Sequence, residues 1–124
     1  MKKILLIEDD SFIIDIYITK LKEVGFSVQS AVNGEDALAK IKQSRPDLVL
    51  LDIVLPQVTG FEFLQEIKSM PELKNVPVIV LSNLGQKKEV EKGLSLGAAK
   101  YLIKAHYTPT EVVEEIRTVL NKNK

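Results

Sequence analysis

Residues 46–60 read PDLVLLDIVLPQVTG, and the run Leu48–Leu51 inside them decides the fold class. Four aliphatic residues stand between a Pro-Asp pair and an aspartate, which is typical of a strand buried on both faces of a parallel sheet. Similar runs occupy residues 4–7, 78–81 and 101–103. Residues 27–32 are less apolar and partly alternate, which predicts an edge strand.

Helical patterns of apolar residues separate these runs. Residues at helical spacing are Phe12, Ile13, Ile16, Tyr17 and Leu21 in the first pattern, Ala37, Leu38 and Ile41 in the second, Phe61, Leu64, Ile67 and Met70 in the third, Val90, Leu94 and Leu96 in the fourth, and Val112, Val113, Ile116, Val119 and Leu120 in the fifth. Gly25 and Gly97 end the first and fourth helices, and Thr108-Pro109 opens the fifth. Strand and helix therefore alternate five times, which predicts a doubly wound parallel sheet with helices on both faces. We expect a single domain over residues 1–124, because no linker-like segment interrupts the chain.

Composition excludes several classes of function. The 124 residues include 17 basic and 17 acidic side chains, so no overall charge attracts nucleic acid or anionic lipid. Cysteine is absent and His106 is the only histidine, which excludes disulfides, thiolate catalysis and cysteine-ligated or multi-histidine metal sites. The apolar runs are too short for a membrane span or a signal peptide. We therefore expect a cytoplasmic protein.

Polar residues follow four of the predicted strands. Glu8 and Asp9 follow the first, Asp52 the third, Ser82 ends the fourth and Lys104 follows the fifth. Because the carboxyl ends of parallel strands meet at one edge, where ligands of such sheets bind, we expect these side chains to lie together. Crowded carboxylates repel unless a cation compensates them, and Mg²⁺ with oxygen ligands is the usual choice.

Some residues at or near these strand ends have an ordinary structural explanation when they are taken one at a time. Asp10, the next residue after the acidic pair, is best explained as the cap of the first helix. A single Lys104 would be best explained as a solvated lysine, and His106 as a surface loop residue. The functional interpretation depends on all four strand ends carrying reactive groups in the same chain.

The joint pattern resembles the receiver domain of two-component response regulators over the whole chain. Asp52 matches the phospho-accepting aspartate of that family, and Glu8 and Asp9 match its acidic pair. Ser82 and Lys104 match its hydroxyl and lysine, and the loop from Asp52 to Gly60 is similar to the loop that follows the acceptor. The resemblance implies the flavodoxin-like fold, a five-stranded sheet of order 2-1-3-4-5.

The resemblance also implies a mechanism. Asp52 would accept a phosphoryl group from a sensor histidine kinase, a phosphotransfer protein or a small phosphodonor, with Mg²⁺ held by the three acids and the backbone carbonyl of Val54. Lys104 would pair with Asp52 and later bind a phosphoryl oxygen, and Ser82 would bind another. Tyr101 stands where the family often has a switching aromatic, and we expect it to turn into space that Ser82 vacates.

The implied protein is a signalling switch rather than an enzyme, because it catalyses only its own phosphorylation and dephosphorylation. Its output would be a downstream effector protein bound through the fourth helix, fifth strand and fifth helix. We expect a monomer or a transient dimer, with no direct contact to nucleic acid or membrane. The sequence names neither the kinase nor the stimulus.

Several positions depart from the family pattern. Ala105 replaces the proline that commonly follows the lysine, so we expect a trans peptide bond and a rearranged loop. Asn83 stands where a small residue is usual and could narrow access to the phosphoryl group. Val54 and Leu84, each two residues past a key position, offer no hydrogen bond to an attacking water. We therefore predict slow self-dephosphorylation, which a phosphoryl lifetime of seconds would contradict.

Three other functions stay open. A non-phosphorylated interaction module on the same fold is favoured only by Ala105 and Asn83, and Mg²⁺ binding would argue against it. A phosphatase of the haloacid dehalogenase type would need a second carboxylate two residues after the nucleophile, where Val54 stands. A flavin or nucleotide binder would need a glycine-rich loop after the first strand, and acids occupy that place.

Overall fold

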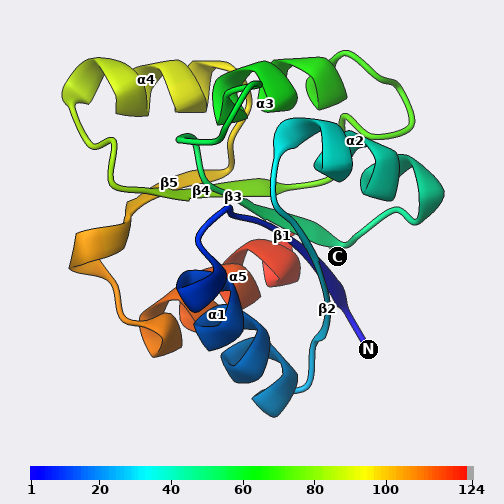
Figure 1. Ribbon diagram of the computed structural model, residues 1–124, viewed down its shortest axis with the longest axis vertical. Coiled ribbons are helices and arrows are strands. Elements are labelled where there is room, and N and C mark those ends of the chain that lie inside the picture. The colour runs from blue at the N-terminus through cyan, green and yellow to red at the C-terminus, as the bar shows by residue number, and fades with distance from the viewer. Residues whose placement is uncertain (123–124) are drawn as a thin grey trace.

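The computed structural model describes residues 1–122. Its centre is a sheet of five strands: β1 Lys3–Ile7, β2 Ser27–Ala31, β3 Leu48–Leu51, β4 Val78–Ser82 and β5 Lys100–Ile103. The strands lie in the order β2-β1-β3-β4-β5, and every neighbouring pair is parallel (Figure 1). The predicted sheet, its strand order and the edge position of β2 are thereby confirmed.

Helices cover both faces of the sheet. α1 Ser11–Glu23 and α5 Pro109–Lys122 lie on one face, and α2 Gly34–Gln43, α3 Gly60–Lys68 and α4 Lys87–Ser95 lie on the other (Figure 1). A 3-10 turn, η1 Lys104–His106, connects β5 to α5. The three layers are those of the predicted flavodoxin-like fold. Within residues 1–122, no helix combines the length and the apolar character that crossing a membrane requires.

Alternate residues of each strand enter two separate cores. In β3, Leu48 and Leu50 pack towards α1 and α5, whereas Val49 and Leu51 pack towards α2 and α3. All four side chains are at most 1% exposed. Both faces of the strand are covered by helices, and the strand sequence is therefore continuously apolar instead of alternating.

Side chains at the strand ends also start the helices. The carboxylate of Asp10 accepts a hydrogen bond from the backbone N–H of Phe12 at 2.9 Å, so Asp10 is the N-cap of α1, as predicted. Asn33 and Thr59 cap α2 and α3 in the same way. These caps fix where each helix leaves the edge of the sheet that carries the acidic residues.

The inner face of α1 differs from the prediction. Ile14, Tyr17 and Leu21 are its buried residues, whereas Phe12 and Ile16 are 74% and 40% exposed. Phe12 and Ile16 each lie two residues from Ile14, which places them about 160° around the helix from it. The apolar residues of α1 therefore form two faces, and only one of them contacts the sheet.

The α4–β5 region is also less buried than its sequence predicts. Leu94 was expected on the inner face of α4 but is 46% exposed, and Gly93 is the buried residue of this helix. β5 is an edge strand, so Tyr101 and Ile103 are half-buried, although their apolar run predicted burial on both faces. Met70, assigned to the third helix, lies in the turn after α3.

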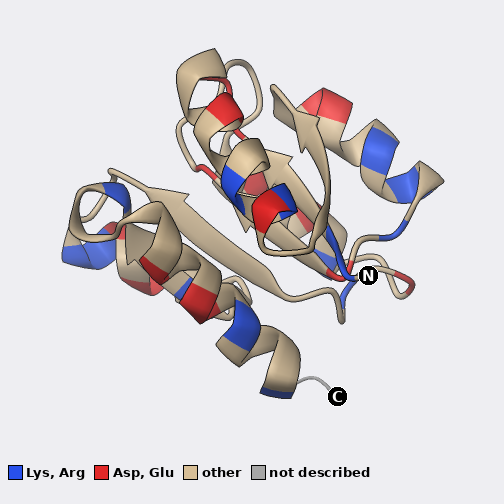
Figure 2. Cartoon of the chain, turned by 90° about the horizontal axis from the view of Figure 1, so that it is seen from below, with Lys and Arg blue, Asp and Glu red and all other residues tan. Residues whose placement is uncertain are grey.

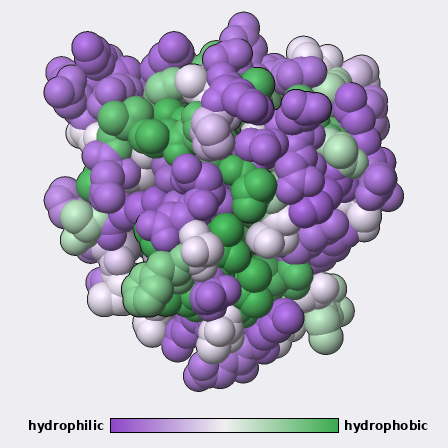
Figure 3. All heavy atoms as spheres, viewed as in Figure 1, coloured by the Kyte–Doolittle hydropathy of each residue, from purple (hydrophilic) through white to green (hydrophobic). Residues whose placement is uncertain are grey.

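The described surface carries mixed charges. Acidic and basic residues are interspersed along the helices in Figure 2, and Lys87 and Glu91 of α4 form an exposed ion pair at 3.9 Å. On the face shown in Figure 3, apolar side chains reach the surface in patches bordered by hydrophilic ones. The described part of α4 therefore presents charges of both signs to solvent.

Candidate functional site

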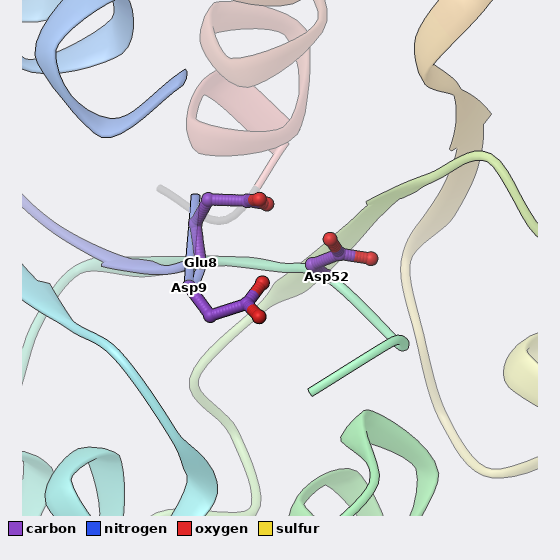
Figure 4. Close-up of side chains that lie close together, drawn as sticks. All are labelled: Glu8, Asp9 and Asp52. Atoms are coloured by element: carbon purple, nitrogen blue, oxygen red, sulfur yellow. The ribbon is translucent and has the colours of Figure 1, made fainter. Parts of the chain in front are cut away.

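Three carboxylates meet at the carboxyl edge of the sheet. Glu8 and Asp9 follow β1, Asp52 follows β3, and each offers an oxygen atom within 4.8 Å of the others (Figure 4). Glu8 is 3% exposed and Asp52 is 6% exposed, whereas Asp9 faces solvent. The structure therefore brings together the acids that the sequence placed at the ends of two different strands.

Backbone hydrogen bonds continue the sheet into this cluster. The N–H of Asp52 donates to the carbonyl of Ile7 at 3.0 Å, and the N–H of Glu8 donates to the carbonyl of Ala31 at 3.0 Å. Because β1 pairs with both β2 and β3, these bonds fix the first acid beside the acceptor position. The spacing of the carboxylates is thus set by strand register.

Lys104 lies between the two buried acids. Its ammonium Nζ is 2.8 Å from Glu8 Oε2 and 2.8 Å from Asp52 Oδ2. The pair with Asp52 is the contact that the family resemblance implied. The sequence placed Glu8 and Lys104 at the same edge of the sheet but did not predict their direct ion pair, which depends on the directions of both side chains.

The charges of the site shift the pKa of its members. Burial raises the pKa of the Glu8 carboxyl to about 7; the hydrogen bond from Lys104 opposes this, and the neighbouring Asp52 adds to it. Burial acts to lower the pKa of Lys104, but the hydrogen bonds and charges of Asp52 and Glu8 outweigh it and raise that pKa. A proton on Glu8 is therefore easily gained or lost near neutral pH.

The donor set fits a hard divalent cation. Among residues 1–122, the three carboxylates face one ammonium group, that of Lys104, so the cluster has excess negative charge and only oxygen ligands. The N–H of Val54 donates to Asp52 Oδ1 at 3.1 Å, which places that residue beside the acceptor. That the backbone carbonyl of Val54 binds the cation as a further ligand stays a prediction.

Ser82 and Tyr101 bond to the same residue, Leu84. The buried Ser82 Oγ accepts a hydrogen bond from the Leu84 N–H at 3.2 Å, and the Tyr101 hydroxyl donates to the Leu84 carbonyl. Burial raises the pKa of Tyr101, and the charges of Glu89 and Asp52 add to this. The Tyr101 hydroxyl thus contacts the segment between β4 and α4, and its expected turn into space that Ser82 vacates stays a prediction.

The loop after the acceptor packs against the acceptor itself. The N–H of Gly60 donates to the carbonyl of Ile53 at 2.9 Å, which closes residues 53–60 into a tight loop. Thr59 and Glu62 form a reciprocal capping box at the start of α3. Gln57 has φ +68°, a left-handed conformation that non-glycine residues seldom adopt.

The Lys104–Ala105 peptide bond is trans, as predicted, since residues 1–122 contain no cis peptide bond. The chain then forms η1, and the N–H of Ala105 donates to Asn83 Oδ1 at 3.1 Å. His106 is exposed on the same turn, as predicted. The two positions that depart most from the family pattern are therefore in contact.

The strand order and the acid–lysine cluster define the receiver class of doubly wound domains. A model of the response regulator receiver domain matches residues 4–117, and the chain belongs to this family. It is thus a signalling domain of two-component systems.

Relatives agree with this assignment. The chain is 37% identical over 121 residues to a probable transcriptional regulator ycf27 of Porphyridium aerugineum, covering 98% of this chain and 49% of that protein. A CheY-like receiver domain protein of Methanospirillum hungatei has a TM-score of 0.92 at 28% identity, covering 98% of this chain and 95% of the other. The phosphorylated cyanobacterial phytochrome response regulator RcpA has a TM-score of 0.82 at 33% identity, covering 95% and 90%.

The chain spans about half the length of the curated relatives it matches. Several relatives are named as transcriptional regulators, one of them as DNA-binding, so the comparison does not support the expectation of no direct contact with nucleic acid. That expectation stays a prediction for this domain.

Proposed function

We propose that the chain is a phosphorylation-dependent switch that accepts a phosphoryl group on Asp52. The observation that carries the proposal is the buried Asp52 carboxylate, held by Lys104 at 2.8 Å beside Glu8 and Asp9. RcpA, one of the similar structures, is described as phosphorylated. The donor would be a phosphohistidine of a sensor kinase or phosphotransfer protein, or a small phosphodonor such as acetyl phosphate.

In the proposed reaction, a carboxylate oxygen of Asp52 attacks the phosphorus atom. A P–O bond to Asp52 forms while the bond to the leaving histidine nitrogen or acetate oxygen breaks, and the leaving group takes the electron pair. Mg²⁺, when bound by Glu8, Asp9 and Asp52, would neutralise charge on the phosphoryl oxygens. Lys104 and the Ser82 hydroxyl would bind two of these oxygens, so the chain contributes positioning and charge stabilisation.

The proposed output starts at Leu84. A phosphoryl group carries about −1.5 to −2 charges and would draw the Ser82 hydroxyl away from the Leu84 N–H. Because the Tyr101 hydroxyl is bonded to the Leu84 carbonyl, movement of Leu84 would reach β5 and α4. The α4–β5–α5 face would then bind an effector protein or a second copy, giving a monomer or a transient dimer, in the cytoplasm.

The close packing of the Tyr101 ring against Gly93 gives one prediction. A Cβ at Gly93 would lie 2.7 Å from Tyr101 Cδ2 and 2.9 Å from Cε2, so Gly93→Ala is expected to displace the ring and break its bond to Leu84. NMR shifts of the Tyr101 ring measure this. Gly34→Ala is the matched control, because its added methyl group meets the Val58 side chain and not Tyr101. If the Tyr101 ring of Gly93→Ala kept the chemical shifts of the parent, the packing of this ring against Gly93 would be contradicted.

The raised pKa of Glu8 predicts the pH dependence of Mg²⁺ binding. With a pKa of about 7, Glu8 must lose its proton to bind the cation, so we expect affinity to fall about tenfold between about pH 8 and about pH 6. Without metal the effect on stability has the opposite sign. The pKa of Glu8 in the folded protein exceeds its ordinary value of 4.5, so the contribution of Glu8 to the free energy of unfolding falls as pH rises from 4.5 to about 7.

Calorimetric titration at several pH values measures this affinity, and Glu8→Gln is the control. The variant is expected to bind Mg²⁺ more weakly and with little dependence on pH over this range. A parent protein whose Mg²⁺ affinity is constant between about pH 6 and about pH 8 would show that the Glu8 proton is not coupled to the metal.

The proposal is tested by intact mass after incubation with acetyl phosphate. We expect one phosphoryl adduct on the parent chain that requires Mg²⁺, and none on a folded Asp52→Asn variant. An Asp15→Asn variant, altered at an exposed acid of α1, is expected to behave like the parent. No adduct on the folded parent would favour the non-phosphorylated interaction module instead.

A further inference from the structure

A hydrogen bond joins the two loops that carry the proposed phosphoryl-binding groups. Asn83 directly follows Ser82 at the end of β4, and Ala105 directly follows Lys104 at the end of β5. The N–H of Ala105 donates to Asn83 Oδ1 at 3.1 Å. The neighbours of the hydroxyl and the ammonium group are thus connected directly.

The bond satisfies a donor that the local fold leaves open. Ala105 is the second residue of η1, and the first N–H groups of a helical turn have no partner within it. Ile103 at the N-cap position has no side-chain acceptor to offer. Asn83 supplies the acceptor from the adjacent strand end and so fixes the turn that begins at Lys104.

Lys104 needs such backbone support once the site is in use. Its side chain is held by Glu8 and Asp52, and these are the groups that a cation and a phosphoryl group would engage. When those carboxylates take new partners, the direction of the Lys104 side chain depends more on its own backbone. That backbone is tied to β4 through strand pairing up to Ile103, and beyond it through Asn83.

We propose that Asn83 is a positioning residue for Lys104, which acts through the Ala105 N–H. Asn83 holds η1, the turn that begins at Lys104, at a fixed distance from Ser82. The Lys104 ammonium group and the Ser82 hydroxyl would then reach the same phosphoryl group. The inference rests on the proposed phosphorylation of Asp52 and adds a residue to it. Asn83 would itself touch no reacting atom.

Two variants separate the hydrogen bond from side-chain bulk. Asn83→Leu keeps a side chain branched at Cγ but has no acceptor, and Asn83→Ala removes both bulk and acceptor. We expect both to slow phosphorylation by acetyl phosphate about 2- to 10-fold, the change equivalent to a hydrogen bond of about 0.5–1.5 kcal/mol. Asn75→Ala, at another exposed asparagine, is the matched control and is expected to keep the parent rate.

A second readout does not depend on phosphorylation. In metal-free protein, the amide proton of Ala105 is expected to move upfield in both Asn83 variants, as an amide proton does when it loses an acceptor. Mg²⁺ affinity and the urea unfolding midpoint are expected to stay near those of the parent, because Asn83 is exposed and belongs neither to the acidic cluster nor to the buried core. A purely structural role would lower the midpoint and leave the rate unchanged.

Each failure has a distinct meaning. A parent protein that forms no adduct overturns the proposed function. A parent that is phosphorylated at the same rate as Asn83→Leu overturns the positioning role, as does a slower Asn83→Leu with an unshifted Ala105 amide. A rate change in Asn83→Ala alone would assign the effect to bulk and also overturn the inference.

Discussion

Lys104→Met is expected to destabilise the metal-free protein by about 3 kcal/mol at about pH 8, because the change leaves Glu8 and Asp52 buried together without a cation. Breaking a buried ion pair on one side is costly, since the remaining charge keeps its desolvation penalty. Here two carboxylates share one ammonium group, so both lose their compensation. The variant is also expected to lose the switch response, because the proposed phosphoryl group would lack its lysine.

The loss of stability depends on pH with a definite sign. The pKa of Glu8 is already about 7, and Lys104 lowers it, so removing Lys104 raises it further. A protonated Glu8 relieves the repulsion, and the destabilisation is therefore expected to be smaller at about pH 6 than at about pH 8. Urea unfolding in EDTA at both values measures the difference.

Lys100→Met is the matched control for this prediction. Lys100 also lies on β5 and pairs with Glu115, but both side chains are more than a quarter exposed. Exposed pairs contribute little, so we expect a loss below about 1 kcal/mol with weak dependence on pH. If Lys104→Met and Lys100→Met lost equal free energies of unfolding, the buried carboxylates would not depend on Lys104 for charge compensation.

Gly60→Ala is expected to destabilise the protein by about 3 kcal/mol and to weaken phosphorylation. A Cβ there would lie 2.5 Å from the carbonyl oxygen of Asp52 and 2.6 Å from Ile53 Cα. Both contacts are with backbone, which cannot rotate aside as a side chain can. The start of α3 or the acceptor strand must therefore move, and the Asp52 carboxylate would move with it.

The control for Gly60→Ala is Gly85→Ala. The added methyl group at residue 85 meets only the Ile103 side chain, at 2.7 Å from its flexible Cδ1 end, so a small rotation relieves the contact. We expect a loss below about 1 kcal/mol and a normal Mg²⁺ affinity. If urea unfolding gives Gly60→Ala the stability of the parent, the loop does not constrain the acceptor.

Most of the architecture could be predicted because the three central strands, β1, β3 and β4, are covered on both faces. The runs around Leu5, Leu50 and Val80 have no polar positions, and this property identifies parallel strands and hence the strand-end site. Prediction failed where a helix or strand contacts only one partner. Phe12 and Leu94 are as apolar as core residues, but they lie outside the contact with the sheet.

The sequence predicted which residues form the site, but it did not predict most of the contacts between them. Asp52 and Lys104 were expected to be partners, because the family resemblance pairs the lysine with the acceptor. Three contacts depend on side-chain directions: the ion pair of Glu8 with Lys104, the packing of Tyr101 against Gly93, and the Asn83–Ala105 hydrogen bond. A sequence pattern gives the end of a strand, whereas a hydrogen bond requires the three-dimensional placement of both partners.

The contact between Glu8 and Lys104 closes a loop of 96 residues. Loop closure of that length comes late in folding, since its entropy is recovered only after intervening contacts form. The acidic cluster alone, from Glu8 to Asp52, requires only the first half of the chain, but its neutralising lysine arrives from β5. The acids are therefore compensated only when β5 has joined the sheet, so a complete site requires the complete fold.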